Sequence, residues 1–75
     1  MTDLTVETAT AYVERYYAAG DCGVDPGSLE VHFVRAQGDG VDRALLFNAA
    51  FTADGRRFTE CWDVWIEDRQ LYGEY

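Results

Sequence analysis

The sequence predicts an α+β fold in which one N-terminal helix packs on a four-stranded antiparallel meander, in the order α-β-β-β-β. Two patterns predict it. A segment near the N-terminus repeats its apolar residues at helical spacing, and four later segments have the composition of strands and are separated by short turn sequences. Because 75 residues are too few for two hydrophobic cores, residues 1–75 are expected to form a single domain.

The helix is expected over Thr5–Ala19. Its apolar face repeats at the spacing of helical turns and contains Val6, Ala9, Val13, Tyr16 and Tyr17. Asp3 or Thr5 can cap the start by accepting hydrogen bonds from the first free amides. The stretch GDCGVDPG, residues 20–27, contains a proline and three glycines, so we expect it to end the helix in a loop.

Four strands are expected after this loop, over Leu29–Ala36, Ala44–Ala53, Arg57–Glu67 and Gln70–Tyr75. The dipeptide Asp54-Gly55 is typical of a two-residue type I′ turn, because both of its residues tolerate positive φ. Such a turn fixes the register of the second and third strands, with Phe47 facing Trp62. A second two-residue turn at Asp68-Arg69 would fix the register of the last two strands.

The two tryptophans are expected on opposite faces of the sheet, because Trp62 and Trp65 are three residues apart and side chains in a strand alternate between faces. The face with Trp62 is almost wholly apolar and is expected to pack on the helix. The first strand would add Leu29, Val31 and Phe33 to it. Glu60 is the exception on this face. We interpret it as lying where the sheet extends beyond the helix, or where a bulge re-aims its side chain.

The second face is the candidate interaction surface, because no further segment remains to cover it. The register places Trp65 opposite Tyr72, a pair that either holds the sheet together or contacts a partner. It also places Asp63 opposite Glu74, two like charges that cost stability unless a cation relieves them. An arginine of a partner could stack on the rings and bind both acids; alternatively, Glu74 points into solvent or the turn differs by one residue. The predicted partner-binding residues are Trp65, Tyr72, Asp63, Glu74, His32 and Asn48, and the same face is expected to hold Val34, Leu46 and Cys61.

The chain is strongly acidic, with a net charge of −8 from fourteen acidic and six basic residues. Such a charge repels nucleic acids and anionic membranes and attracts basic protein surfaces. We therefore expect no direct nucleic-acid or membrane binding and a partner with a basic surface. The alternative is that the acidity only aids solvation, as in a salt-rich cytoplasm or a GC-biased genome.

Neither an enzyme, a cofactor nor a metal site is predicted. His32 has no serine, cysteine or aspartate at an indicative spacing, and two cysteines with one histidine do not supply the four ligands of a structural zinc site. The N-terminal segment has no export signal, so we expect a cytoplasmic protein in which Cys22 and Cys61 stay reduced, with no disulfide. A domain this small is also a candidate for homodimerisation.

The closing stretch WDVWIEDRQLYGEY is similar in style to the last hairpin of nuclear-transport-factor-like domains, and the helix followed by a meander resembles a pared-down cystatin-like or nuclear-transport-factor-like fold. In size, acidity and lack of a catalytic motif the chain also resembles the small inhibitors of phages and mobile elements, including the anti-CRISPR proteins. The second resemblance and the charge imply a non-enzymatic inhibitor that engages the basic, nucleic-acid-binding surface of a defence or nucleic-acid-handling complex. The alternatives are a small dimeric domain that binds a small molecule, and an acidic protein whose charge serves only solvation.

Overall fold

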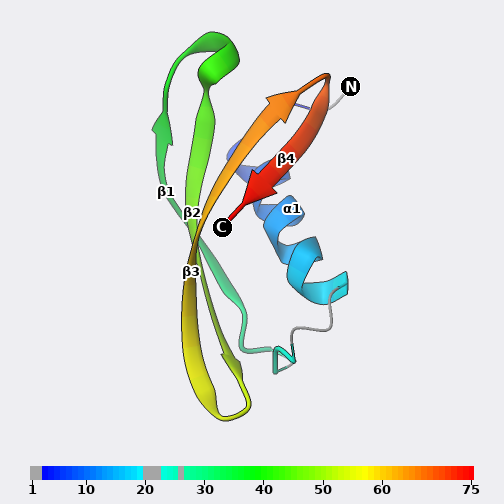
Figure 1. Cartoon of the computed structure of the whole chain (residues 1–75), viewed down its shortest axis with the longest axis vertical. Helices are drawn as coiled ribbons and strands as arrows, with labels where there is room; N and C mark the ends of the chain where they lie inside the picture. Colours follow the sequence, from blue (N-terminus) through cyan, green and yellow to red (C-terminus); the bar gives the residue numbers. More distant parts are fainter. Residues whose placement is uncertain (1–2, 20–22, 26) are drawn as a thin grey trace.

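The computed structural model describes residues 3–19, 23–25 and 27–75 and has the predicted α+β architecture (Figure 1). The elements are α1 (Val6–Ala19), β1 (Glu30–Gln37), the short 3₁₀ helix η1 (Gly40–Asp42), β2 (Ala44–Ala53), β3 (Arg56–Glu67) and β4 (Gln70–Glu74). The helix and the strands begin and end within one residue of the predicted bounds, whereas η1 was not predicted. Among the described residues, no helix is long and apolar enough to cross a membrane.

The start of α1 is held by a reciprocal pair of hydrogen bonds. The backbone N–H of Thr8 donates to Thr5 Oγ1 at 3.1 Å, and the N–H of Thr5 donates to Thr8 Oγ1 at 3.0 Å. Both amides precede the first hydrogen-bonded turn and would otherwise lack a partner in the helix. Thr5 is therefore the cap, one of the two predicted candidates.

The sheet has the strand order β1-β2-β3-β4, and both predicted hairpin registers are confirmed. Phe47 pairs with Trp62 across the first hairpin, and Trp65 pairs with Tyr72 across the second. The turns have the backbone that their sequences favour. The φ angles are 52° and 72° at Asp54-Gly55 and 49° and 64° at Asp68-Arg69, positive at all four positions.

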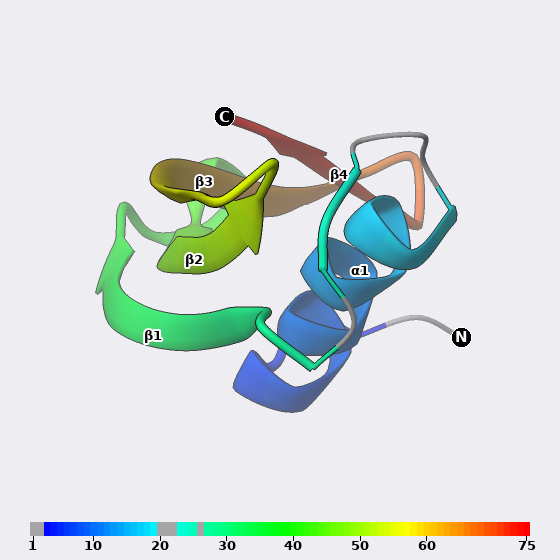
Figure 2. The same ribbon diagram turned by 90° about the horizontal axis from the view of Figure 1, so that it is seen from below.

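The core lies between α1 and one face of the sheet (Figure 2). Trp62 is 1% exposed at its centre, packed among Phe47, Leu45, Val13 and Val64. From β1 and the residue before it, Val31 and Leu29 pack partly against this cluster, as predicted. Phe33 faces the core side and contacts the ring of Phe47 at 5.6 Å, but it is 43% exposed because β1 is an edge strand that α1 covers incompletely.

The first strand departs from the predicted alternation at one position. The register of β1 against β2 shifts between Phe33 and Arg35, which leaves Val34 as the extra residue of a β-bulge. After the bulge Arg35 pairs with Leu46, so the regular alternation predicted for this strand is interrupted at Val34. The bulge places the basic side chain of Arg35 next to Leu46 on the second face of the sheet. The sequence predicted an apolar residue at this position.

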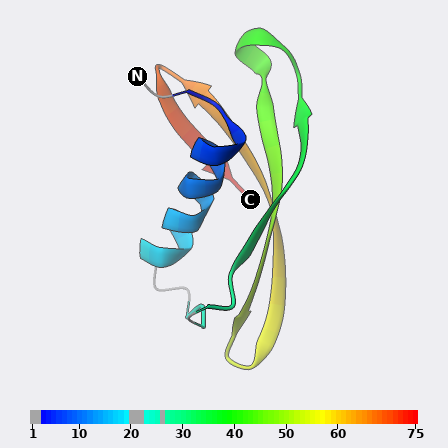
Figure 3. The ribbon, with the colours of Figure 1, turned by 180° about the vertical axis from the view of Figure 1, so that it is seen from behind.

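The pairing around Glu60 is regular, so a bulge does not explain its place on the apolar face. Glu60 pairs with Ala49, and the β2–β3 hairpin extends past the end of α1, as Figures 1 and 3 show from opposite sides. The first interpretation is correct only in that the cover of α1 ends near Glu60. The carboxylate lies at the border of the helix-covered region and accepts a hydrogen bond from Tyr17.

A glycine substitution tests the tight connection between β1 and β2. Gly38 has a φ of +76°, and a Cβ at this position would clash with the backbone carbonyl oxygen of Asp42. We expect Gly38→Ala to lower the free energy of unfolding by about 2–3 kcal/mol, because backbone strain and a clash with backbone add together. Gly40 has a φ of +57° with nothing within 4 Å, so Gly40→Ala should cost only the strain, about 1 kcal/mol. Urea unfolding of both variants measures the difference; equal losses would show that the connection relaxes.

Candidate functional site

The sheet face away from α1 is covered by no other element of the described residues (Figure 2). Even-numbered residues of β2 and odd-numbered residues of β3 point to it, because their neighbours in the strands form the core. We call it the open face. All six predicted partner-binding residues lie on the open face by this alternation.

An aromatic pair occupies the β3–β4 side of the open face. The rings of Trp65 and Tyr72 are stacked, with centroids 6.3 Å apart and planes 24° from parallel. Tyr72 is 37% exposed, and Trp65 is half-buried between Tyr72 and Ala44, its neighbours on the adjacent strands. Ala44 has a small side chain, and part of the Trp65 side chain remains accessible.

A shallow groove of about 310 Å³ lies beside this pair and joins three of the predicted residues, Asp63, Trp65 and Glu74. Asp63 and Glu74 are directly opposite one another on β3 and β4, as predicted. The connection before β2 forms the other wall with Val41, Asp42 and Arg43. The carboxylates of this groove outnumber its single guanidinium, so the groove is acidic.

The other three predicted residues do not line the groove: Tyr72 stacks on Trp65 beside it, and His32 and Asn48 lie farther away. His32 pairs with Asn48, and Asn48 pairs with Cys61, in a row that crosses the open face farther from β4. Leu46 and its row separate these residues from Trp65. His32 and Cys61 are exposed, and Cys61 is a free thiol. Cys22, the second cysteine, lies outside the described residues, so the expected lack of a disulfide is untested.

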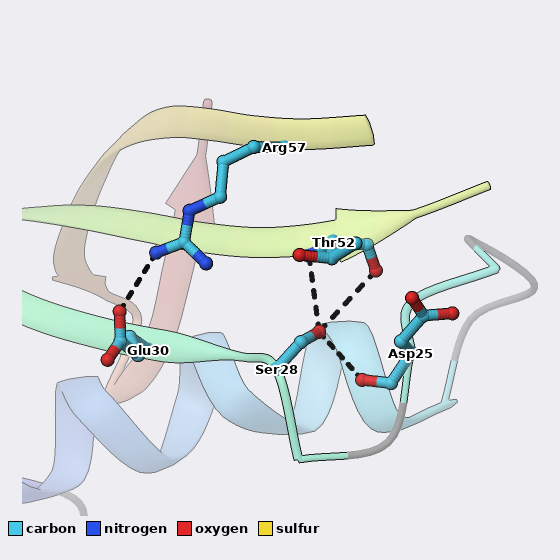
Figure 4. A network of polar contacts seen from close by, with 5 residues as sticks. All are labelled: Asp25, Ser28, Glu30, Thr52 and Arg57. Atoms are coloured by element: carbon cyan, nitrogen blue, oxygen red, sulfur yellow. Dashed lines mark hydrogen bonds and ion pairs between the residues drawn. The ribbon is translucent and has the colours of Figure 1, made fainter. Parts of the chain in front are cut away.

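The one ion pair formed by the described residues lies at the hairpin end of the same face (Figure 4). Arg57 reaches across β2 to Glu30, with Nη2 3.0 Å from Oε2. Nearby, Ser28 donates from its hydroxyl to the carbonyl of Asp25 at 2.7 Å and accepts from the N–H of Thr52 at 3.1 Å. These contacts attach the segment before β1 to β2. Both partners of the ion pair are more than half exposed, so it adds little to stability.

Asp63 and Glu74 take no part in that ion pair. Two basic residues that sequence reasoning missed lie close to them: Arg43 in the wall of the groove, and Arg35, which is in the same row across Leu46. Arg43 directly follows the turn QGDGVD, so the sequence places it just before the second strand but does not place it in the groove wall. Arg35 reaches this row only through the bulge, which has no signal in the sequence.

The open face presents aromatic rings and carboxylates, which are groups that bind ligands. In the described part of the chain, no three side chains among His, Cys, Asp and Glu lie close enough to hold a metal ion. His32 points to the open face from an edge strand and pairs with an asparagine. The groove itself is wide open to solvent, whereas a general acid or base works best where water is excluded.

Comparison of the chain with protein families, curated proteins and solved structures finds no match.

Proposed function

We propose that this protein is a non-enzymatic binding module whose open face engages a basic protein surface. The observation that carries the proposal is the groove lined by Trp65 and the opposed carboxylates Asp63 and Glu74, with Tyr72 stacked on Trp65 beside it. Aromatic faces and paired acids are the two groups that an arginine side chain recognises together.

The like-charge pair supports this proposal. Opposed carboxylates on neighbouring strands repel each other, and neither Asp63 nor Glu74 forms an ion pair with another described residue. A guanidinium from a partner would neutralise both and stack against the accessible part of Trp65. The two carboxylates repel each other in the free protein, and both would be attracted to the guanidinium in the complex. Locally unfavourable arrangements of this kind are expected at binding sites.

The overall charge supports a nucleic-acid-binding surface as the target. A net charge of −8 on 75 residues steers the protein toward basic surfaces and away from phosphates. We therefore propose that it acts as an inhibitor, occupying the basic groove of a defence or nucleic-acid-handling complex in the cytoplasm and excluding nucleic acid from it.

The test uses a fluorescein-labelled oligoarginine peptide as a model basic surface, with fluorescence anisotropy as the readout. The double variant Asp63→Asn/Glu74→Gln should raise the dissociation constant by about tenfold or more, because a desolvated charge pair is lost. The matched control Glu7→Gln/Glu14→Gln removes the same charge from exposed helix positions and should have a much smaller effect. Binding of the unchanged protein should weaken as salt rises.

Equal weakening by the two double variants would show that only net charge matters and would contradict a site on the open face. Light scattering behind a sizing column adds an independent check. A monomer at low and high salt agrees with the proposal, whereas a dimer that persists at both salts and buries Trp65 would replace it with self-association.

A further inference from the structure

The β2–β3 hairpin extends past the end of α1 (Figure 3). A second pocket lies there, on the side of the sheet that faces α1. Its volume is about 260 Å³, smaller than the pockets that hold drug-sized molecules. Four aromatic rings and two carboxylates line it: Tyr16, Phe51, Phe58, Tyr75, Asp54 and Glu60. No lysine, arginine or histidine is among its lining residues.

The four rings form two walls from distant parts of the chain. Phe51 and Phe58 are cross-strand neighbours in the hairpin, stacked with centroids 5.5 Å apart and planes 22° from parallel. Tyr16 of α1 and Tyr75 after β4 meet at 5.5 Å, and their hydroxyl groups are joined by a hydrogen bond of 2.7 Å. Tyr16, Tyr75 and Phe58 are exposed, so a ligand in the pocket can contact these three rings, whereas Phe51 is buried beneath them.

A hydrogen-bond chain from the core holds the carboxylate of Glu60 at this pocket. The indole N–H of Trp62 donates to the Tyr17 hydroxyl at 2.8 Å, and that hydroxyl donates to Glu60 Oε1 at 2.5 Å. Burial raises the pKa of Tyr17 well above its usual value, and the bond to Glu60 raises it further, so Tyr17 stays a neutral donor. The second oxygen of Glu60 has no hydrogen bond to a described residue and is left for a ligand.

We propose that this pocket binds a quaternary ammonium group, carried by a free small molecule or by a trimethylated lysine side chain. A cation with an apolar surface gains from several aromatic faces and from a fixed negative charge, and it needs no hydrogen bonds. A guanidinium fits less well, because its planar fork gains most from two free carboxylate oxygens and one oxygen of Glu60 already accepts a hydrogen bond from Tyr17. A bare ammonium is strongly hydrated and would lose that hydration against the rings.

This inference is independent of the proposed function. The pocket and the groove lie on opposite faces of the sheet, and no residue lines both. Variants of one site therefore leave the other intact, and either proposal can fail alone.

The experiment titrates the protein with tetramethylammonium chloride at constant ionic strength, with sodium chloride as the reference, and follows backbone amide chemical shifts by NMR. We expect saturable shifts centred on Phe58, Glu60 and Tyr75. Glu60→Gln, which keeps an oxygen acceptor for Tyr17, should weaken binding by roughly tenfold, and Phe58→Leu, which keeps an apolar side chain without a π face, by roughly fivefold. Glu67→Gln, on the open face, is the charge-matched control and should leave binding unchanged.

Two further titrations use choline and a short peptide that contains trimethyl-lysine. The one that binds more tightly identifies whether the quaternary ammonium group comes from a small molecule or from a lysine side chain. Guanidinium chloride that binds as tightly as tetramethylammonium would overturn the choice of cation. Shifts that do not saturate, or that persist unchanged in both Glu60→Gln and Phe58→Leu, would overturn the site. Far-UV circular dichroism of each variant confirms that loss of binding is not loss of fold.

Discussion

Trp62→Ala is expected to lower the free energy of unfolding by about 3–5 kcal/mol, the largest effect of any single substitution in this protein. Trp62 is 1% exposed and is the largest fully buried side chain. Its ring lies 4.9 Å from Tyr16 and 5.0 Å from Tyr75, so a cavity there would loosen both α1 and the segment after β4. The variant would also remove the N–H that donates to Tyr17. Urea unfolding followed by far-UV circular dichroism measures the loss.

Trp65→Ala is the matched control, because it removes the same side chain from the other face of the same strand. Trp65 is only half-buried and its main described contact is the stacked ring of Tyr72. We expect a loss of about 1 kcal/mol, the scale of a cross-strand aromatic pair. If Trp65→Ala unfolds the protein as readily as Trp62→Ala, the open face is structural and its proposed binding role is wrong.

Gly73→Val is expected to cause the second large loss in the free energy of unfolding, although valine is normally favourable in a strand. A Cβ at Gly73 would lie 2.7 Å from Cε1 of Tyr12 and 3.2 Å from Cε3 and Cζ3 of Trp62. The Gly73 N–H also donates to the Tyr12 hydroxyl at 3.1 Å, so a shift of that tyrosine would break a hydrogen bond. We expect a loss of about 3 kcal/mol from overpacking, measured by urea unfolding.

Gln70→Val places the same side chain at an exposed position of the same strand and is expected to be neutral within about 0.5 kcal/mol. If Gly73→Val leaves the free energy of unfolding unchanged, β4 can move away from α1 at no energetic cost. In that case the contact of Tyr12 with β4 would not belong to the cooperative core.

The open face follows from local rules. Asp54-Gly55 and Asp68-Arg69 each make a two-residue turn, and such a turn leaves one pairing for the strands on either side. The opposite faces of Trp62 and Trp65, and the facing of Asp63 and Glu74, then follow from the two-residue period of a strand. For this reason the candidate site was predictable in its aromatic pair and its two acids.

The bulge at Val34 was not predictable from the sequence pattern. The pattern assumes that side chains alternate strictly along a strand, whereas a bulge inserts one extra residue and interrupts the alternation. The bulge at Val34 brings Arg35 into the row of Leu46 and Asp63. The place of Arg43 in the groove wall likewise depends on how η1 packs next to β2, a contact between segments and not a property of either.

The sequence by itself determined the order of elements, the hairpin registers and the division of the sheet into a covered and an open face, because turn type and strand period act between near neighbours. Only the tertiary structure decided where α1 ends relative to the hairpin. That position brings Tyr16 together with Phe58, Glu60 and Tyr75 around one pocket, and it lets Tyr17 donate a hydrogen bond to Glu60. The packing of a helix along a sheet is set by the shapes of many side chains at once, so residues more than forty positions apart meet in a way that no local pattern encodes.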